Sequence, residues 1–93
     1  MIVKTMGMAM KCYVYVFAST HDALVAERCW KKLDYRGKLR PVPRVLSPGC
    51  GLCLEVHLPP DADPGELARQ QGFSWQDIFL FSDKEYISYK NPG

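Results

Sequence analysis

The residues of this 93-residue chain that most readily carry chemistry are its four cysteines. Cys50 and Cys53 stand three positions apart in the stretch SPGCGLCL, where a Pro-Gly turn passes into an alternating apolar segment. Cysteines at this spacing can form a redox pair, bind a metal ion, or leave one reactive thiol beside a structural neighbour. Of the other two, Cys29 lies on the apolar stripe of an expected helix and is predicted to be core, and we identify no partner for Cys12.

Length and composition indicate one ordinary globular domain. Hydrophobic residues make up 47% and charged residues 24% of the chain, which argues against wholesale disorder. The longest apolar run, Tyr13 to Ala18, is far too short to span a membrane, and residues 1–10 do not resemble a secretory signal. We therefore expect a cytoplasmic protein with reduced thiols. We expect no cofactor, because phosphate-loop, nucleotide-binding and Ser/His/Asp patterns are missing. We expect no bound metal, because a single C-x-x-C is only half of a zinc site.

The net charge of +2 conceals a basic segment. Seven of the twelve Lys and Arg residues stand between Arg28 and Arg44, against the single acid Asp34. Such a segment is typical of a solvated helix face followed by an edge strand, and it also offers a docking surface for a partner.

The hydrophobic pattern predicts two helices and four strands in the order β-α-β-β-α-β. Strands are expected at 13–18, 38–45, 52–58 and 77–82, where β-branched, aromatic or alternating apolar residues concentrate. One helix follows Ser19, with Gly37 placed to stop it, and a shorter helix runs from an Asp63 cap to Gly72. This order is typical of the ferredoxin-like fold, an α+β fold in which two helices cover one face of a four-stranded antiparallel sheet.

The domain is thus predicted to span residues 12–82. It follows a flexible leader at 1–11 and precedes a polar tail at 83–93. Within the tail, the stretch EYISYK could add a short strand-like extension to the domain. Within the domain, Pro41 and Pro43 are two positions apart, so both missing N–H groups point to the same side of a strand. We therefore expect 38–45 to be an edge strand.

This topology brings three connections to one end of the domain, and the connection that contains Cys50 is among them. The first helix starts at the same end, where unpaired N–H groups and the helix dipole favour negative charge. A thiolate at Cys50 would be stabilised there, and Gly49 and Gly51 leave its sulfur sterically open. The residues expected around it are Ser19, Thr20, His21 and Arg44.

Cys53 is expected to lie elsewhere. By alternation it shares a face with Glu55 and His57, either the sheet face opposite the helices or a lateral interface. If residues 50–53 are all extended, the two cysteine Cα atoms are about 10 Å apart, too far for a disulfide unless the turn continues through Leu52. Cys53 and His57 are about 13 Å apart along a strand, too far to share one metal ion.

Two stretches, YVYVFASTHDALVAERCWKKL and RPVPRVLSPGCGLCLEV, resemble the putative selenium/sulfur carrier protein-like family of small bacterial domains, and the resemblance covers residues 13–81. It implies a single ferredoxin-like domain that holds sulfur or selenium on the cysteine of a Pro-Val-Pro-Arg…Cys-Gly motif, here Cys50. The motif also carries over Pro41, Pro43, Arg44, Ser47 and Gly51. Cys53 departs from the family pattern, in which a small apolar residue is usual, so a dithiol is not implied for the family. Soft-metal carriers with this fold place a C-x-x-C before the first helix, where this chain has STHD.

Three functions stay open, and a carrier is favoured over an enzyme. In the first, Cys50 receives sulfur or selenium from a cysteine desulfurase or a selenium-metabolism protein and passes it, as a persulfide or selenopersulfide, to an acceptor protein. In the second, Cys50 and Cys53 form a thiol-disulfide redox pair.

The third function is a binding or dimerisation module without chemistry. It requires an aromatic sheet surface made by Tyr13, Tyr15 and Phe17, together with Phe79 or Phe81. If the phase of the first strand is one residue off, the three first-strand rings are core instead. We expect no nucleic-acid partner, because the RNP1 signature is missing. We also expect no membrane partner, because the longest apolar run is short. A homodimer fits this third function.

Overall fold

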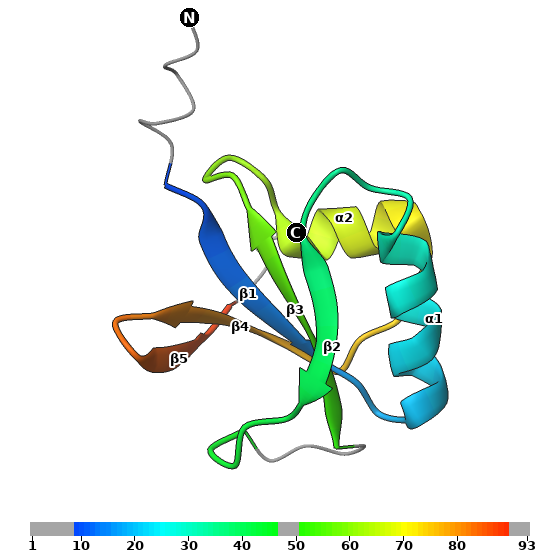
Figure 1. Cartoon of the computed structure of the whole chain (residues 1–93), viewed down its shortest axis with the longest axis horizontal. Coiled ribbons are helices and arrows are strands. Elements are labelled where there is room, and N and C mark those ends of the chain that lie inside the picture. The colour runs from blue at the N-terminus through cyan, green and yellow to red at the C-terminus, as the bar shows by residue number, and fades with distance from the viewer. Residues whose placement is uncertain (1–8, 47–50, 90–93) are drawn as a thin grey trace, which may run out of the picture.

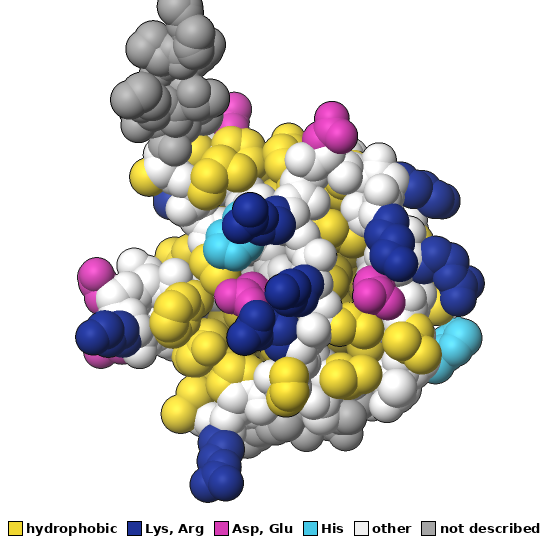
Figure 2. Space-filling model, in the orientation of Figure 1, with side chains coloured by type: hydrophobic (Ala, Val, Ile, Leu, Met, Phe, Trp, Pro, Cys, Tyr) yellow, Lys and Arg dark blue, Asp and Glu magenta, His cyan; other side chains and the backbone are white. Residues whose placement is uncertain are grey.

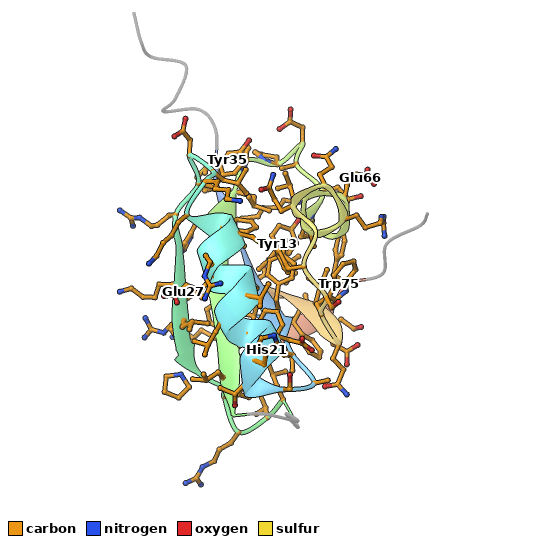
Figure 3. All side chains as sticks on the ribbon, turned by 90° about the vertical axis from the view of Figure 1, so that its right-hand side faces the viewer. Tyr13, His21, Glu27, Tyr35, Glu66 and Trp75 are labelled. Atoms are coloured by element: carbon orange, nitrogen blue, oxygen red, sulfur yellow. The ribbon has the colours of Figure 1, made fainter. Side chains whose placement is uncertain are left out.

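The computed structural model describes residues 9–46 and 51–89 of the chain (Figure 1). In chain order the elements are β1 (Lys11–Val16), α1 (Thr20–Trp30), β2 (Gly37–Pro41), β3 (Leu52–Leu58), α2 (Pro64–Gln71), β4 (Asp77–Ser82) and β5 (Glu85–Ser88). The five strands form one antiparallel sheet in the order β2-β3-β1-β4-β5. Both helices lie over one face of the sheet, which we call the covered face (Figure 3). The opposite face is the open face.

The covered face carries the main hydrophobic core. Tyr13 and Tyr15 of β1 are paired with Val56 and Leu54 of β3, and all four side chains are buried under the helices together with Phe17. The Tyr15 hydroxyl donates a 2.7 Å hydrogen bond to the Pro64 carbonyl at the start of α2. The structure therefore excludes the aromatic surface on β1 and confirms the alternative phase, in which these rings are core.

Both helices begin at the caps that the sequence predicts. The Ser19 hydroxyl accepts the Asp22 N–H at 3.1 Å, and the Asp63 carboxylate accepts the Gly65 N–H at 2.9 Å. α2 ends at Gly72, whose φ of +81° lies in the left-handed region that glycine tolerates best. Within residues 9–46 and 51–89, neither helix is long and apolar enough to cross a membrane.

Gly37 does not stop α1, which contradicts the prediction. The helix ends at Trp30, and Gly37 is the first residue of β2. A Cβ atom at Gly37 would fall on the Cδ1 and Nε1 atoms of the buried Trp30 ring. The ring is also held in place by a hydrogen bond, since Nε1–H donates to the Tyr35 carbonyl at 3.1 Å. The glycine is therefore required by the close approach of strand and indole.

β2 lies at the edge of the sheet, as its prolines predict. Val42 donates its N–H to the Gly51 carbonyl at 3.0 Å, and the Arg36 carbonyl accepts from β3 at 3.0 Å. The backbone groups of even-numbered residues thus form the hydrogen bonds to β3. The missing N–H groups of Pro41 and Pro43 fall on the free side of the strand.

The strand is shorter than the predicted range 38–45, because it ends at Pro41. The chain then turns, with the Leu46 N–H donating to the Pro43 carbonyl at 3.0 Å. Leu46 is buried against Val14, Val16 and Cys53. The segment after β2 therefore folds back onto the open face.

The sheet has five strands rather than the four predicted. β5 pairs with β4 through a two-residue turn at Asp83 and Lys84, whose φ angles are 51° and 65°. Two-residue hairpins need such angles and usually obtain them from Asn-Gly or Asp-Gly. Because Asp-Lys lacks that signature, the sequence indicates only a short extension in the range 83–93, in place of a fifth strand.

Candidate functional site

The predicted carrier residue Cys50 and the motif residue Ser47 lie outside the described residues. The structure describes the two chain segments on either side of them, ending at Leu46 and beginning at Gly51, which we call the stem. Gly51 is exposed and directly precedes β3. Its φ of +88° is left-handed, a conformation that glycine adopts readily. Its carbonyl closes the stem by accepting the Val42 N–H at 3.0 Å. The end of β2 and the start of β3 lie at the same end of the molecule as the start of α1 (Figure 1).

The other predicted site residues occupy two separate places. Ser19 caps α1 and Thr20 is its first residue, followed by the exposed His21, which lies near the start of the helix in Figure 3. Arg44 is exposed in the turn between Pro43 and Leu46. Cys53 is on the open face, so the sheet separates it from α1.

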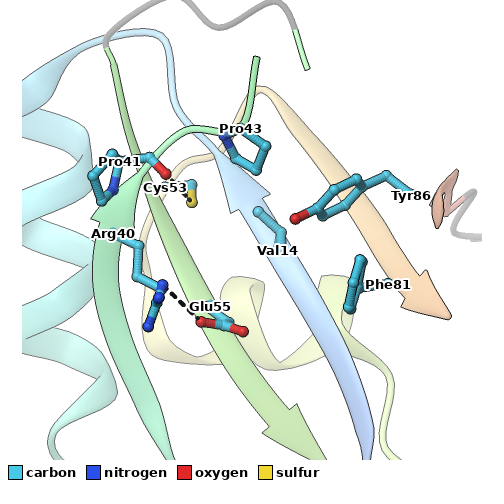
Figure 4. Close-up of a pocket in the computed structure, with 8 residues that line it drawn as sticks. All are labelled: Val14, Arg40, Pro41, Pro43, Cys53, Glu55, Phe81 and Tyr86. Carbon is cyan, nitrogen blue, oxygen red and sulfur yellow. Dashed lines mark hydrogen bonds and ion pairs between the residues drawn. The ribbon is translucent and has the colours of Figure 1, made fainter. Parts of the chain in front are cut away.

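Cys53 lies in a small hollow on the open face, which we call the open-face pocket (Figure 4). Its exposed fraction is 2%, and its Sγ–H is directed at the Pro41 carbonyl at 3.9 Å. The pocket has a volume of about 140 Å³. Its lining residues are Val14, Arg40, Pro41, Pro43, Cys53, Glu55, Phe81 and Tyr86. A thiol buried in this way cannot meet a sulfur atom that is carried on the surface of another protein.

A second group of polar side chains follows the pocket along β3. The Cys12 thiol donates to Glu55 Oε2 at 3.5 Å, and Arg40 Nε approaches Glu55 Oε1 at 3.2 Å. His57 stands directly opposite Cys12 in the pairing of β3 with β1. Sequence reasoning missed this group, because the partners come from three strands and only their register brings them together. Cys12, Glu55 and His57 could together hold a metal ion.

The comparisons with known proteins give one match. The family model described as "Putative Se/S carrier protein-like" matches residues 12–80, from the second residue of β1 into β4. The chain belongs to this family. No curated protein and no solved structure matches the chain.

The family match includes all four cysteines of the chain, Cys12, Cys29, Cys50 and Cys53. Of the three that the structure describes, Cys53 is buried, whereas Cys12 and Cys29 are partly exposed. Cys29 packs against the main core, as predicted. None of these three cysteines is fully exposed.

The thiol of Cys12 is expected to react slowly with alkylating agents. Burial, followed by the adjacent Glu55 carboxylate, raises the pKa of Cys12 to about 11. Because only the thiolate reacts, alkylation at pH 8 should be roughly a hundredfold slower than for an ordinary cysteine. Iodoacetamide pulses with peptide mapping should show a rate that still rises between pH 9 and 10. Glu55→Gln should speed the reaction, and a plateau near pH 9 would contradict the raised pKa.

Proposed function

We propose that the protein is a sulfur or selenium carrier that loads its cargo on Cys50. The observation that carries the proposal is the family match over residues 12–80, which includes the whole Pro41-to-Gly51 motif. In the loading step, the Cys50 thiolate attacks the outer sulfur of a persulfide on a donor such as a cysteine desulfurase. A new S–S bond forms, the donor cysteine leaves as a thiolate, and Cys50 becomes the persulfide that an acceptor protein takes over.

Three features of the described residues support this assignment. The described stem ends at Gly51, which is exposed and has no side chain. The start of α1, with its positive dipole end, lies at the same end of the sheet (Figure 1). Arg44 is exposed in the turn that leads into the connection. Positive charge of this kind stabilises both a thiolate and a persulfide anion. The architecture fits a ferredoxin-like domain extended by β5.

The proposal is tested by loading the purified chain with sulfur. The protein is incubated with a cysteine desulfurase and cysteine, and intact mass and peptide mapping locate the added sulfur. We expect one extra sulfur atom on the peptide that contains Cys50. Replacing cysteine by selenocysteine, from which the desulfurase forms a selenopersulfide donor, should give the corresponding selenium adduct if both elements are cargo. An adduct found only on Cys12 or Cys29 would contradict the proposal.

A redox function of Cys50 and Cys53 is a second candidate, and the conformation of Gly51 favours it. The separation of about 10 Å between the two Cα atoms assumes an extended chain. Gly51 is left-handed, with φ +88°, so the chain bends between the two cysteines. The extended-chain argument against a disulfide therefore does not apply across Gly51.

The donor and acceptor are proposed to dock on the basic surface of β2 and α1. Arg36 and Lys38 of this region are exposed, as is Lys31 at the end of α1. Figure 2 shows Lys and Arg side chains gathered over β2 and α1. A surface of this sign attracts partners with an acidic docking face.

Charge reversal on this surface should slow sulfur loading. Lys38→Glu combined with Arg36→Glu is expected to reduce the loading rate about tenfold at low salt, because electrostatic steering mainly affects the association rate. The difference from wild type should shrink at high salt. Time courses of adduct formation at two salt concentrations measure it. Lys84→Glu in the β4–β5 turn is the matched control for Lys38→Glu alone, and an equal effect of these two single variants would argue against a localised docking surface.

A further inference from the structure

The side chains of Cys12, Glu55 and His57 form a compact group on the open face. Each offers one ligand atom, and these atoms all lie within 4.8 Å of one another. All three side chains are partly buried. We propose that this group is a binding site for a zinc-like divalent cation, distinct from the proposed carrier site. It supplies one thiolate, one imidazole nitrogen and one carboxylate oxygen.

Strand pairing makes the site. Cys12 of β1 and His57 of β3 are direct cross-strand partners, and Glu55 lies two residues before His57 on the same face. Cross-strand neighbours have Cα atoms about 4.5–5.5 Å apart, so their side chains can converge on one ion. A tetrahedral ion with bonds of 2.0–2.3 Å needs ligand atoms about 3.3–3.7 Å apart. The Cys12 Sγ and Glu55 Oε2 atoms are already 3.5 Å apart.

Arg40 prepares the carboxylate for this role. Its Nε atom lies 3.2 Å from Glu55 Oε1, whereas the other oxygen, Oε2, faces the Cys12 sulfur. The guanidinium therefore fixes the orientation of the carboxylate and leaves Oε2 to bind an ion. Such an outer partner is a common feature of metal sites, where it orients the ligand. Arg40 is thus a positioning residue, and Glu55 is a ligand through one oxygen.

The ligand set selects the type of ion. Thiolate and imidazole favour Zn²⁺ and related transition metals over Mg²⁺ or Ca²⁺, which prefer oxygen ligands. Arg36, Lys38 and Arg40 line the hollow beside Glu55 and His57, and their positive charges repel any divalent cation. Only ligands that bind strongly, such as thiolate and imidazole, can offset this repulsion. When the S–Zn bond forms, the Cys12 thiol releases its proton to solvent. A water molecule can take the fourth position through the adjoining hollow of about 220 Å³ beside Glu55 and His57.

The site is tested by metal binding to the reduced full-length chain. Zn²⁺ competition with a chromophoric chelator should give one ion per chain. Co²⁺ should give a near-ultraviolet charge-transfer band from a cysteine thiolate. In the wild-type protein, Zn²⁺ should slow alkylation of Cys12 and leave Cys29 unchanged. This last readout needs no substitution, so it does not depend on the folding of a variant.

Matched substitutions identify the ligands. Cys12→Ser should remove the Co²⁺ band, and His57→Gln should weaken Zn²⁺ binding at least about tenfold. Cys29→Ser and His21→Gln, which change the same residue types outside the group, should behave like wild type. Three outcomes would overturn the proposal: no Zn²⁺ protection of Cys12, equal binding by the ligand and control variants, or a Co²⁺ band that persists in Cys12→Ser and disappears in Cys50→Ala. None of these readouts requires sulfur loading, so failure of the metal site and failure of the carrier function are distinguishable.

Discussion

Replacing Cys50 by alanine is expected to abolish sulfur loading, whereas Cys53→Ala should retain most of it. Loading needs a thiolate that can reach a persulfide on the surface of another protein. The exposed fraction of Cys53 is 2%, and burial together with Glu55 raises the pKa of Cys12 to about 11. Neither thiol can therefore substitute for Cys50. Intact mass after incubation with desulfurase and cysteine measures the difference, with Cys29→Ala as the control for loss of a partly exposed cysteine.

The same variants separate the carrier function from the redox alternative. If Cys50 and Cys53 form a disulfide, mild oxidation of wild type should remove two hydrogen atoms from the peptide that contains both. Either substitution would then prevent that loss. If loading instead continues unchanged in Cys50→Ala, the proposed role of Cys50 is wrong. If loading fails in Cys53→Ala and that variant is folded, a dithiol mechanism becomes the better explanation.

The part of the fold that could be predicted from sequence depends on short-range patterns. Ser19, Asp63 and Gly72 act within a few residues of their own positions, and the structure confirms all three as helix ends. The prolines of β2 indicate an edge strand for an equally local reason, the loss of N–H donors. The alternation in β3 likewise predicts that Cys53 shares a face with Glu55 and His57, away from the helices.

The remaining features depend on contacts between distant segments. Spacing along β3 predicts that His57 cannot share a metal ion with Cys53, but it does not predict that strand register places His57 opposite Cys12, which is far away in sequence. The phase of β1 decides whether Tyr15 is a surface or a core residue, and only pairing with β3 fixes it. The segment after β2 covers Cys53 because Leu46 folds back, a contact with no local signature.

Gly37→Ala is expected to be more destabilising than the same substitution at Gly51 or Gly72. The added Cβ would fall on the Trp30 ring, which is buried and held by the hydrogen bond from Nε1 to the Tyr35 carbonyl. Such overpacking against a fixed ring should cost about 3 kcal/mol of unfolding free energy. Urea unfolding monitored by circular dichroism measures it, and the midpoint should fall without a large change in the m value.

Gly72→Ala is the informative control, because it separates backbone strain from steric collision. Gly72 has a φ of +81° and no atom within 4 Å of the added Cβ, so its substitution should cost only about 1 kcal/mol. The collision at Gly37 can be relieved from the other side, since Trp30→Leu removes the atoms that the methyl would strike. In a double-mutant cycle, Gly37→Ala should therefore cost less in the Trp30→Leu background than in wild type. An equal cost in both backgrounds would show that the glycine serves the backbone of β2, and that the contact between strand and indole is not what requires it.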